Sequence, residues 1–165
     1  MGERYRLTAS FGIGAAELAK LMATPGFAEA EAFIDGAVEA RCVEQGRDGA
    51  AVRFRIDRVD HSRERSGKKA KGKTERSVTH QDWDLAKASC RWRVEAPGYT
   101  GIVDVRGTTR LEPEPGGCRY TEEGEMTVRI PVIGRIIARS VVADIKRGFP
   151  QKVRFIEETI AKSKN

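Results

Sequence analysis

A glutamate on an otherwise apolar strand face is the residue of this chain best placed to do chemistry. In the segment 117–130, Cys118, Tyr120 and Met126 fall on one side at a spacing of two, and continuing that alternation points Glu122 to the same inward side. An ionised carboxylate is costly to bury without a partner, so an inward glutamate indicates a functional acid or a ligand-orienting group. A β-bulge at Glu122–Gly124 would instead turn the side chain outward, and the pattern leaves both arrangements open.

The stretch HQDWD sets three more polar groups on one side of a strand. His80, Asp82 and Asp84 have the spacing and chemistry of a mononuclear metal site or an acid–base set. Polar residues at a spacing of two are also typical of the solvated face of a sheet, and that interpretation is favoured. Motifs for zinc, phosphate or dinucleotide binding are missing from the sequence. We therefore predict neither a metal nor a cofactor.

Positive charge is concentrated in one short segment. The formal net charge is +6, and residues 63–76 hold seven Lys and Arg against two Glu, so they account for all but one unit of it. Four of these residues are candidates for contact with an anionic surface: Lys68, Lys69, Lys71 and Lys73. Residues 62–77 contain no aromatic side chain on which a base could stack, which disfavours sequence-specific RNA binding. A solvated, mobile hairpin is the alternative.

Apolar periodicity predicts the elements that position these groups. A strand is expected at 4–11, and two short helices at GAAELAKLMA and FAEAEAFID. The period then changes to two, and strands are expected at 37–44, 50–60, 75–83, 86–95, 101–111 and 117–130. Turn residues separate most of them, so we predict an antiparallel meander with one face buried. Residues 62–76 are expected to form a basic hairpin loop within it.

The last segment returns to a helical period. From Val132 to about Lys162 the apolar residues form one stripe, which must be buried against the only large apolar surface available, the concave face of the sheet. The predicted fold class is therefore α+β. It comprises about seven antiparallel strands curved around a long C-terminal helix, with two short helices after the first strand, as a single domain over 1–165.

The second half of the chain resembles a known superfamily. The segments RGTTRLEP and GCRYTEEGEMTVRIP, followed by PVIG before the last helix, resemble a bacterial family of unassigned function within the START-like or SRPBCC superfamily. The resemblance implies a helix-grip fold, as in Bet v 1-like proteins, with a cavity for an apolar ligand between sheet and helix. Candidate lining residues are Phe54, Trp92, Val105, Tyr120, Glu122, Met126, Val141, Ile145 and Phe149. Ordinary core packing is the alternative for each apolar member of this set.

Three functions remain open on the sequence. The first is a non-enzymatic binding or carrier domain for a lipid-like or aromatic small molecule. The second is an enzyme of cyclase or hydrolase type that uses Glu122, assisted by Tyr120 or His80. The third is an interaction module that contacts an anionic membrane or a nucleic acid through residues 63–76, on a hairpin tip away from the cavity. No signal peptide or membrane-spanning run is present, so a cytoplasmic location is expected.

Overall fold

A computed structural model describes residues 2–165 as seven strands and three α-helices. The chain begins with β1 (Glu3–Phe11), followed by α1 (Ala15–Met22) and α2 (Pro25–Ile34). Six strands follow: β2 (Glu39–Asp48), β3 (Ala51–Arg63), β4 (Lys69–Asp84), β5 (Ser89–Glu95), β6 (Val103–Glu114) and β7 (Gly117–Val128), with a short 3₁₀ turn at Pro97–Tyr99. The long helix α3 (Gly134–Ser163) ends the chain. None of the helices in residues 2–165 is both long and apolar enough to cross a membrane.

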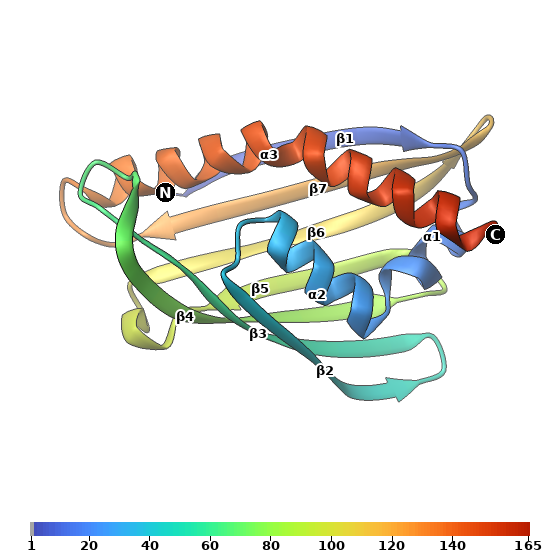
Figure 1. Cartoon of the computed structure of the whole chain (residues 1–165), viewed down its shortest axis with the longest axis horizontal. Coiled ribbons are helices and arrows are strands. Elements are labelled where there is room, and N and C mark those ends of the chain that lie inside the picture. Colours follow the sequence, from blue (N-terminus) through green and yellow to red (C-terminus); the bar gives the residue numbers. More distant parts are fainter. Residues whose placement is uncertain (1) are drawn as a thin grey trace.

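The strands form one antiparallel sheet in the order β1-β7-β6-β5-β4-β3-β2. The sheet curves around α3, which lies along its concave side, and α1 and α2 cover the remainder of that side (Figure 1). We call the face toward α3 the inner face. This arrangement confirms the predicted α+β helix-grip architecture, including the two short helices after β1 and the long C-terminal helix.

Buried side chains form two apolar clusters on the inner face. The larger cluster joins α1 and α2 to the sheet and includes Phe54, Tyr120 and Ile156. The smaller cluster lies under the first half of α3 and includes Tyr5 and Met126. Trp92 packs against both clusters, and its ring lies where a side chain at Gly107 would stand, because a Cβ added to that glycine would be 2.3 Å from the indole.

The basic segment differs from its prediction. Expected as a loop over 62–76, it is mostly strand, because β3 runs to Arg63 and β4 starts at Lys69. The tip also contacts the body of the protein instead of standing away from the inner face. Arg63 Nη1 donates to Asp144 Oδ2 of α3 at 2.5 Å, and Ser140 Oγ donates to the Gly67 carbonyl at 2.8 Å. Ladder hydrogen bonds join β3 to β4, and these two contacts hold the hairpin against α3.

Candidate functional site

Glu122 points into the protein from the middle of β7. Its strand is paired with β1 on one side and β6 on the other without a register shift, so Glu122 lies opposite Leu7 and Thr109 in regular ladders. The β-bulge that would have turned it outward is therefore not formed. The residue is only 6 % exposed and lies between the two apolar clusters.

Three side chains donate hydrogen bonds to the Glu122 carboxylate. Tyr120 Oη donates to Oε1 at 2.6 Å, and Tyr5 Oη, from β1, donates to Oε2 at 2.9 Å. Lys152 Nζ, from α3, donates to Oε1 at 3.1 Å. Gly124 leaves the space that the Tyr5 ring occupies, because a Cβ there would lie 2.5 Å from it. The carboxylate thus has a cation and two hydroxyl donors around it.

Lys152 joins this carboxylate to two acidic residues from the region of α2. It is only 7 % exposed, and its Nζ lies 3.2 Å from Asp35 Oδ2 and 3.8 Å from Glu31 Oε2. The Asp35 side chain is 39 % exposed, so the group reaches from the buried end at Glu122 toward solvent at Asp35. We call Tyr5, Glu31, Asp35, Tyr120, Glu122 and Lys152 the inner polar cluster.

Sequence reasoning missed Lys152, although the pattern carried a signal for it. The residue lies three positions after Phe149 and four before Ile156, so it falls on the buried stripe of α3. A lysine at such a position needs a buried counter-charge, and the one acidic residue predicted to point inward was Glu122. Glu31 and Asp35 had no comparable signal, because acidic residues on a short helix are usually solvated.

Electrostatics keep Glu122 and Lys152 charged. Burial alone would raise the pKa of Glu122, but the Lys152 ammonium and the hydrogen bonds from Tyr120 and Tyr5 outweigh it and hold that pKa below its ordinary value. Burial opposes the charged form of Lys152 too, but Asp35 and Glu122 raise its pKa well above the ordinary value. A permanently protonated amine is a poor nucleophile, so Lys152 is suited to binding and orienting rather than to covalent chemistry.

Glu31 has a pKa close to neutral pH. Burial raises its pKa to about 7, against the opposing effect of Lys152, while the negative charges of Asp35 and Glu122 raise it further. Three carboxylates around one ammonium cannot all ionise cheaply, and burial together with the Glu122 charge raises the pKa of Asp35 as well, against the opposing effect of Lys152. Burial and the neighbouring Glu122 charge also raise the pKa of Tyr5 and Tyr120, which therefore remain hydrogen-bond donors.

The predicted lining residues divide between the two apolar clusters. Phe54 and Tyr120 are fully buried in the larger one, against which Phe149 packs. Met126 is buried in the smaller one, and three partly exposed residues pack against it: Val105, Val141 and Ile145. Trp92 bridges the clusters. All of these residues therefore contribute to the packing on the concave side, with the inner polar cluster between the two groups.

Two buried polar atoms of the inner face have no hydrogen-bond partner among residues 2–165. They are Arg58 Nε of β3 and Thr79 Oγ1 of β4. Arg58 follows Phe54 and Ile56 at a spacing of two, and Thr79 is paired with Ile56, so both belong to the inner face. The charge of Arg58 also acts on the pKa of Glu31. Buried polar groups in proteins are nearly always satisfied, so these atoms require a partner such as water or a ligand.

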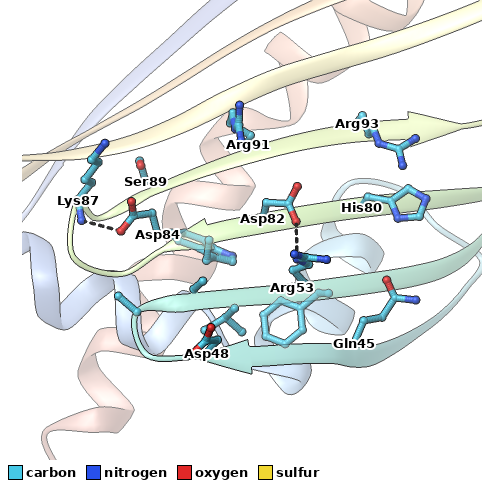
Figure 2. A pocket seen from close by; sticks show the side chains of 15 residues that line it. Gln45, Asp48, Arg53, His80, Asp82, Asp84, Lys87, Ser89, Arg91 and Arg93 are labelled. Carbon is cyan, nitrogen blue, oxygen red and sulfur yellow. Dashed lines mark hydrogen bonds and ion pairs between the residues drawn. The ribbon is translucent and has the colours of Figure 1, made fainter.

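The three candidate residues of HQDWD lie on the outer, convex face of the sheet. His80, Asp82 and Asp84 line an open hollow of about 1040 Å³ over β2 to β5 (Figure 2). Asp82 faces Arg53 at 3.9 Å, and His80 Nε2 lies 3.4 Å from Glu95 Oε1. Across residues 2–165, no three His, Cys, Asp or Glu side chains are grouped so that they could hold a metal ion. His80 is thus on the opposite face from Glu122 and cannot assist it.

Residues 6–160 match the model of a family described as protein of unknown function (DUF2505). The chain belongs to that family. The match covers nearly the whole domain, including the inner polar cluster except for Tyr5. No curated protein sequence matches the DUF2505 chain.

Solved structures of the same fold include bacterial and plant proteins. TTHA0849 from Thermus thermophilus superposes with a TM-score of 0.65 at 18 % identity, covering 99 % of this chain and 100 % of its own. The ZhuI aromatase/cyclase from Streptomyces sp. R1128 has a TM-score of 0.68 at 14 % identity, covering 99 % and 96 %. Norcoclaurine synthase from Thalictrum flavum has a TM-score of 0.63 at 13 % identity, covering 100 % and 98 %. These similarities establish a Bet v 1-like SRPBCC helix-grip fold for the DUF2505 chain.

Proposed function

We propose that this chain binds an amphipathic small molecule, lipid-like or aromatic, on the inner face of the sheet. The observation that carries the proposal is the buried ion pair of Glu122 and Lys152, with two tyrosine hydroxyls on the same carboxylate. A buried ion pair is a poor source of stability compared with apolar residues of the same volume. Its value is greater as a fixed array of donors and acceptors that orients the polar end of a ligand.

Incomplete burial of the apolar residues around the cluster supports an apolar body for that ligand. Val105, Val141 and Ile145 remain partly exposed although they face the inner side of the fold. A ligand lying between β6 and the first half of α3 would cover them. The polar group of the ligand would reach the inner polar cluster. Arg58 Nε and Thr79 Oγ1, on the same face and without hydrogen-bond partners in the described residues, are further groups to which a ligand could form hydrogen bonds.

The neutral fluorescent probe 1-naphthol combines an apolar ring system with one hydroxyl group and tests this arrangement. We expect saturable binding by fluorescence titration, and we expect Val105→Trp to weaken it at least about tenfold because the indole occupies the space of the probe. The matched control is Arg106→Gln, one residue along β6 on the outer face, which should bind as the unaltered chain does. Equal affinity in the Val105→Trp variant would exclude the inner face as the binding site.

An enzymatic function is the second candidate, and Glu31 is the observation that favours it. Its pKa of about 7 and its position 3.8 Å from Lys152 suit a general base at neutral pH, whereas Glu122 is held as a carboxylate. Two proteins of similar fold carry catalytic names: ZhuI is an aromatase/cyclase, and norcoclaurine synthase has been solved in complex with dopamine and hydroxybenzaldehyde. In a condensation of an amine with an aldehyde, Lys152 would assist by donating a hydrogen bond to the carbonyl oxygen of the aldehyde.

Incubation with dopamine and hydroxybenzaldehyde tests this second candidate. The expected result is product formation with a rate that rises with pH through an apparent pKa of about 7. In Glu31→Gln the rate should fall about 100-fold or more and lose that pH dependence. A rate equal to that of buffer alone from about pH 5.5 to about pH 8.5 would contradict catalysis of this reaction class.

A further inference from the structure

An exposed, strained valine precedes α3. Val132 is 88 % exposed and has a φ of +70°, a left-handed conformation that β-branched residues rarely adopt. Ile136, in the first turn of α3, is 44 % exposed. Within residues 2–165, neither aliphatic side chain is buried by the rest of the protein, so packing does not explain an aliphatic residue at either position. Backbone strain of this kind is most common at functional sites, which indicates that Val132 serves a function and not the stability of the fold.

Basic residues that form no ion pair in the described part of the chain lie at the same end of the molecule as these two aliphatic side chains. Arg135 lies between them in the sequence, and the turn of the β3–β4 hairpin packs on the same part of α3: a Cβ at Gly67 would stand 3.1 Å from the Ile136 carbonyl oxygen. The β3–β4 turn and the start of β4 lie at the same end of the molecule as the start of α3 (Figure 1), and these segments contain five exposed basic residues: Arg65, Lys68, Lys69, Lys71 and Lys73. Neither these five residues nor Arg135 form an ion pair within residues 2–165.

We propose that this end, comprising Val132, Ile136, Arg135 and the hairpin lysines Lys68, Lys69, Lys71 and Lys73, docks on an anionic lipid bilayer. Clustered lysines are attracted electrostatically to an anionic membrane surface. Exposed aliphatic side chains at the same place can enter the boundary between lipid headgroups and acyl chains. Nucleic acid would use the same cations, but it offers no apolar phase for Val132 and Ile136. The hairpin also lacks the aromatic residues that stack on bases. The proposal does not depend on ligand binding at the inner face.

Sedimentation with vesicles tests the docking surface. The full chain is mixed with phosphatidylcholine vesicles that contain about 30 % phosphatidylserine, and with vesicles of phosphatidylcholine alone. We expect binding to the anionic vesicles only, weakening as salt rises. Replacing the four hairpin lysines by Gln should weaken it about a hundredfold or more, since each lysine near the surface is equivalent to roughly fivefold in affinity.

The aliphatic part of the surface has its own variant. Val132→Asn removes the apolar side chain and introduces a residue that tolerates a positive φ. The variant should therefore be as stable as the unaltered chain, or more stable. Vesicle binding is expected to fall about tenfold, the equivalent of one valine side chain transferred from an apolar phase to water. Unchanged vesicle binding in a folded Val132→Asn variant would overturn the proposal.

A matched control removes four positive charges elsewhere. Lys20, Lys87, Lys162 and Lys164 lie on α1, in the β4–β5 turn and at the C-terminal end of α3, at the other end of the molecule (Figure 1). Replacing all four by Gln should leave vesicle binding within about twofold of the original. An equal loss in this control would assign binding to net charge and overturn the docking surface. Binding to a DNA duplex without binding to the anionic vesicles would overturn it as well.

Discussion

Replacing Lys152 by Met is expected to lower the free energy of unfolding by about 3–5 kcal/mol. The substitution preserves much of the side-chain volume but leaves Glu122 charged, buried and without its cation, with only the hydroxyls of Tyr5 and Tyr120 to stabilise it. Urea denaturation followed by tryptophan fluorescence measures the change at neutral pH. A loss below about 1 kcal/mol would mean that the ion pair is not buried as described.

Two further variants separate the ion pair from the lysine stem. In the double variant with Glu122→Gln, position 122 carries no charge, and the amide oxygen accepts from one tyrosine hydroxyl while the amide NH2 group donates to the oxygen of the other. Asp35 and Glu31 still lack the lysine, so at least half of the loss, but not all of it, should be recovered. The exposed Lys146→Met on the same helix should change stability by no more than about 0.5 kcal/mol. Failure of the double variant to recover stability would contradict coupling between Glu122 and Lys152.

Protein stability should fall as pH rises from about 4.5 to about 7, on account of Glu31. Its folded-state pKa is about 7 against an ordinary value of 4.5, so in this interval the folded state keeps a proton that the unfolded state has lost. The steepest slope is about −1.4 kcal/mol per pH unit, and the total contribution is on the order of 3 kcal/mol. Urea midpoints measured across the interval report it.

The contribution of Glu31 is isolated by comparison with Glu31→Gln, which cannot ionise. Relative to the unaltered chain, this variant should gain stability as pH rises from about 4.5 to about 7 and show no further gain above. Glu29→Gln on the same helix serves as the control, because Glu29 forms no ion pair in the described part of the chain, and it should leave the pH dependence unchanged. If the urea midpoints of Glu31→Gln and of the unaltered chain changed with pH in parallel, the raised pKa of Glu31 would be contradicted.

Below pH 4.5 the sign reverses for Glu122. Its folded-state pKa is lowered, so the stability it contributes is fully present above its unfolded pKa and is lost as pH falls through the folded value. Acid unfolding should therefore set in below about pH 4.5, where Glu31 becomes protonated in the unfolded state as well as in the folded state.

The alternation of apolar residues predicted the strand order along the chain and the inward side of β7, because a buried face imposes a period of two. It predicted that Glu122 points inward only as one of two arrangements, since the choice depended on whether Gly124 marked a bulge. The structure gives Gly124 another role, which is to leave space for the Tyr5 ring. That role depends on a contact between β1 and β7, far apart in the sequence.

Long-range contacts also explain the two main differences between the sequence predictions and the structure, at segment 62–76 and at Glu31 and Asp35. The charged and polar residues of segment 62–76 predict a basic hairpin loop, but most of the segment is strand, stabilised by ladder pairing and by the contact of Arg63 with Asp144 of α3. Glu31 and Asp35 were not selected because their significance comes from Lys152, which lies more than a hundred residues later. Short-range patterns carry no information about such partners.

The two tryptophans of the chain offer a direct measurement of whether a small molecule binds at the inner face beside Glu122 and Lys152. Trp92 packs against both apolar clusters, whereas Trp83 belongs to the larger cluster alone, near the end of β4 that the proposed ligand does not reach. In two-dimensional NMR spectra, a titration with 1-naphthol is predicted to shift the Trp92 indole N–H resonance with saturation and to leave that of Trp83 in place. A saturable shift of Trp83 with Trp92 unmoved would contradict the claim.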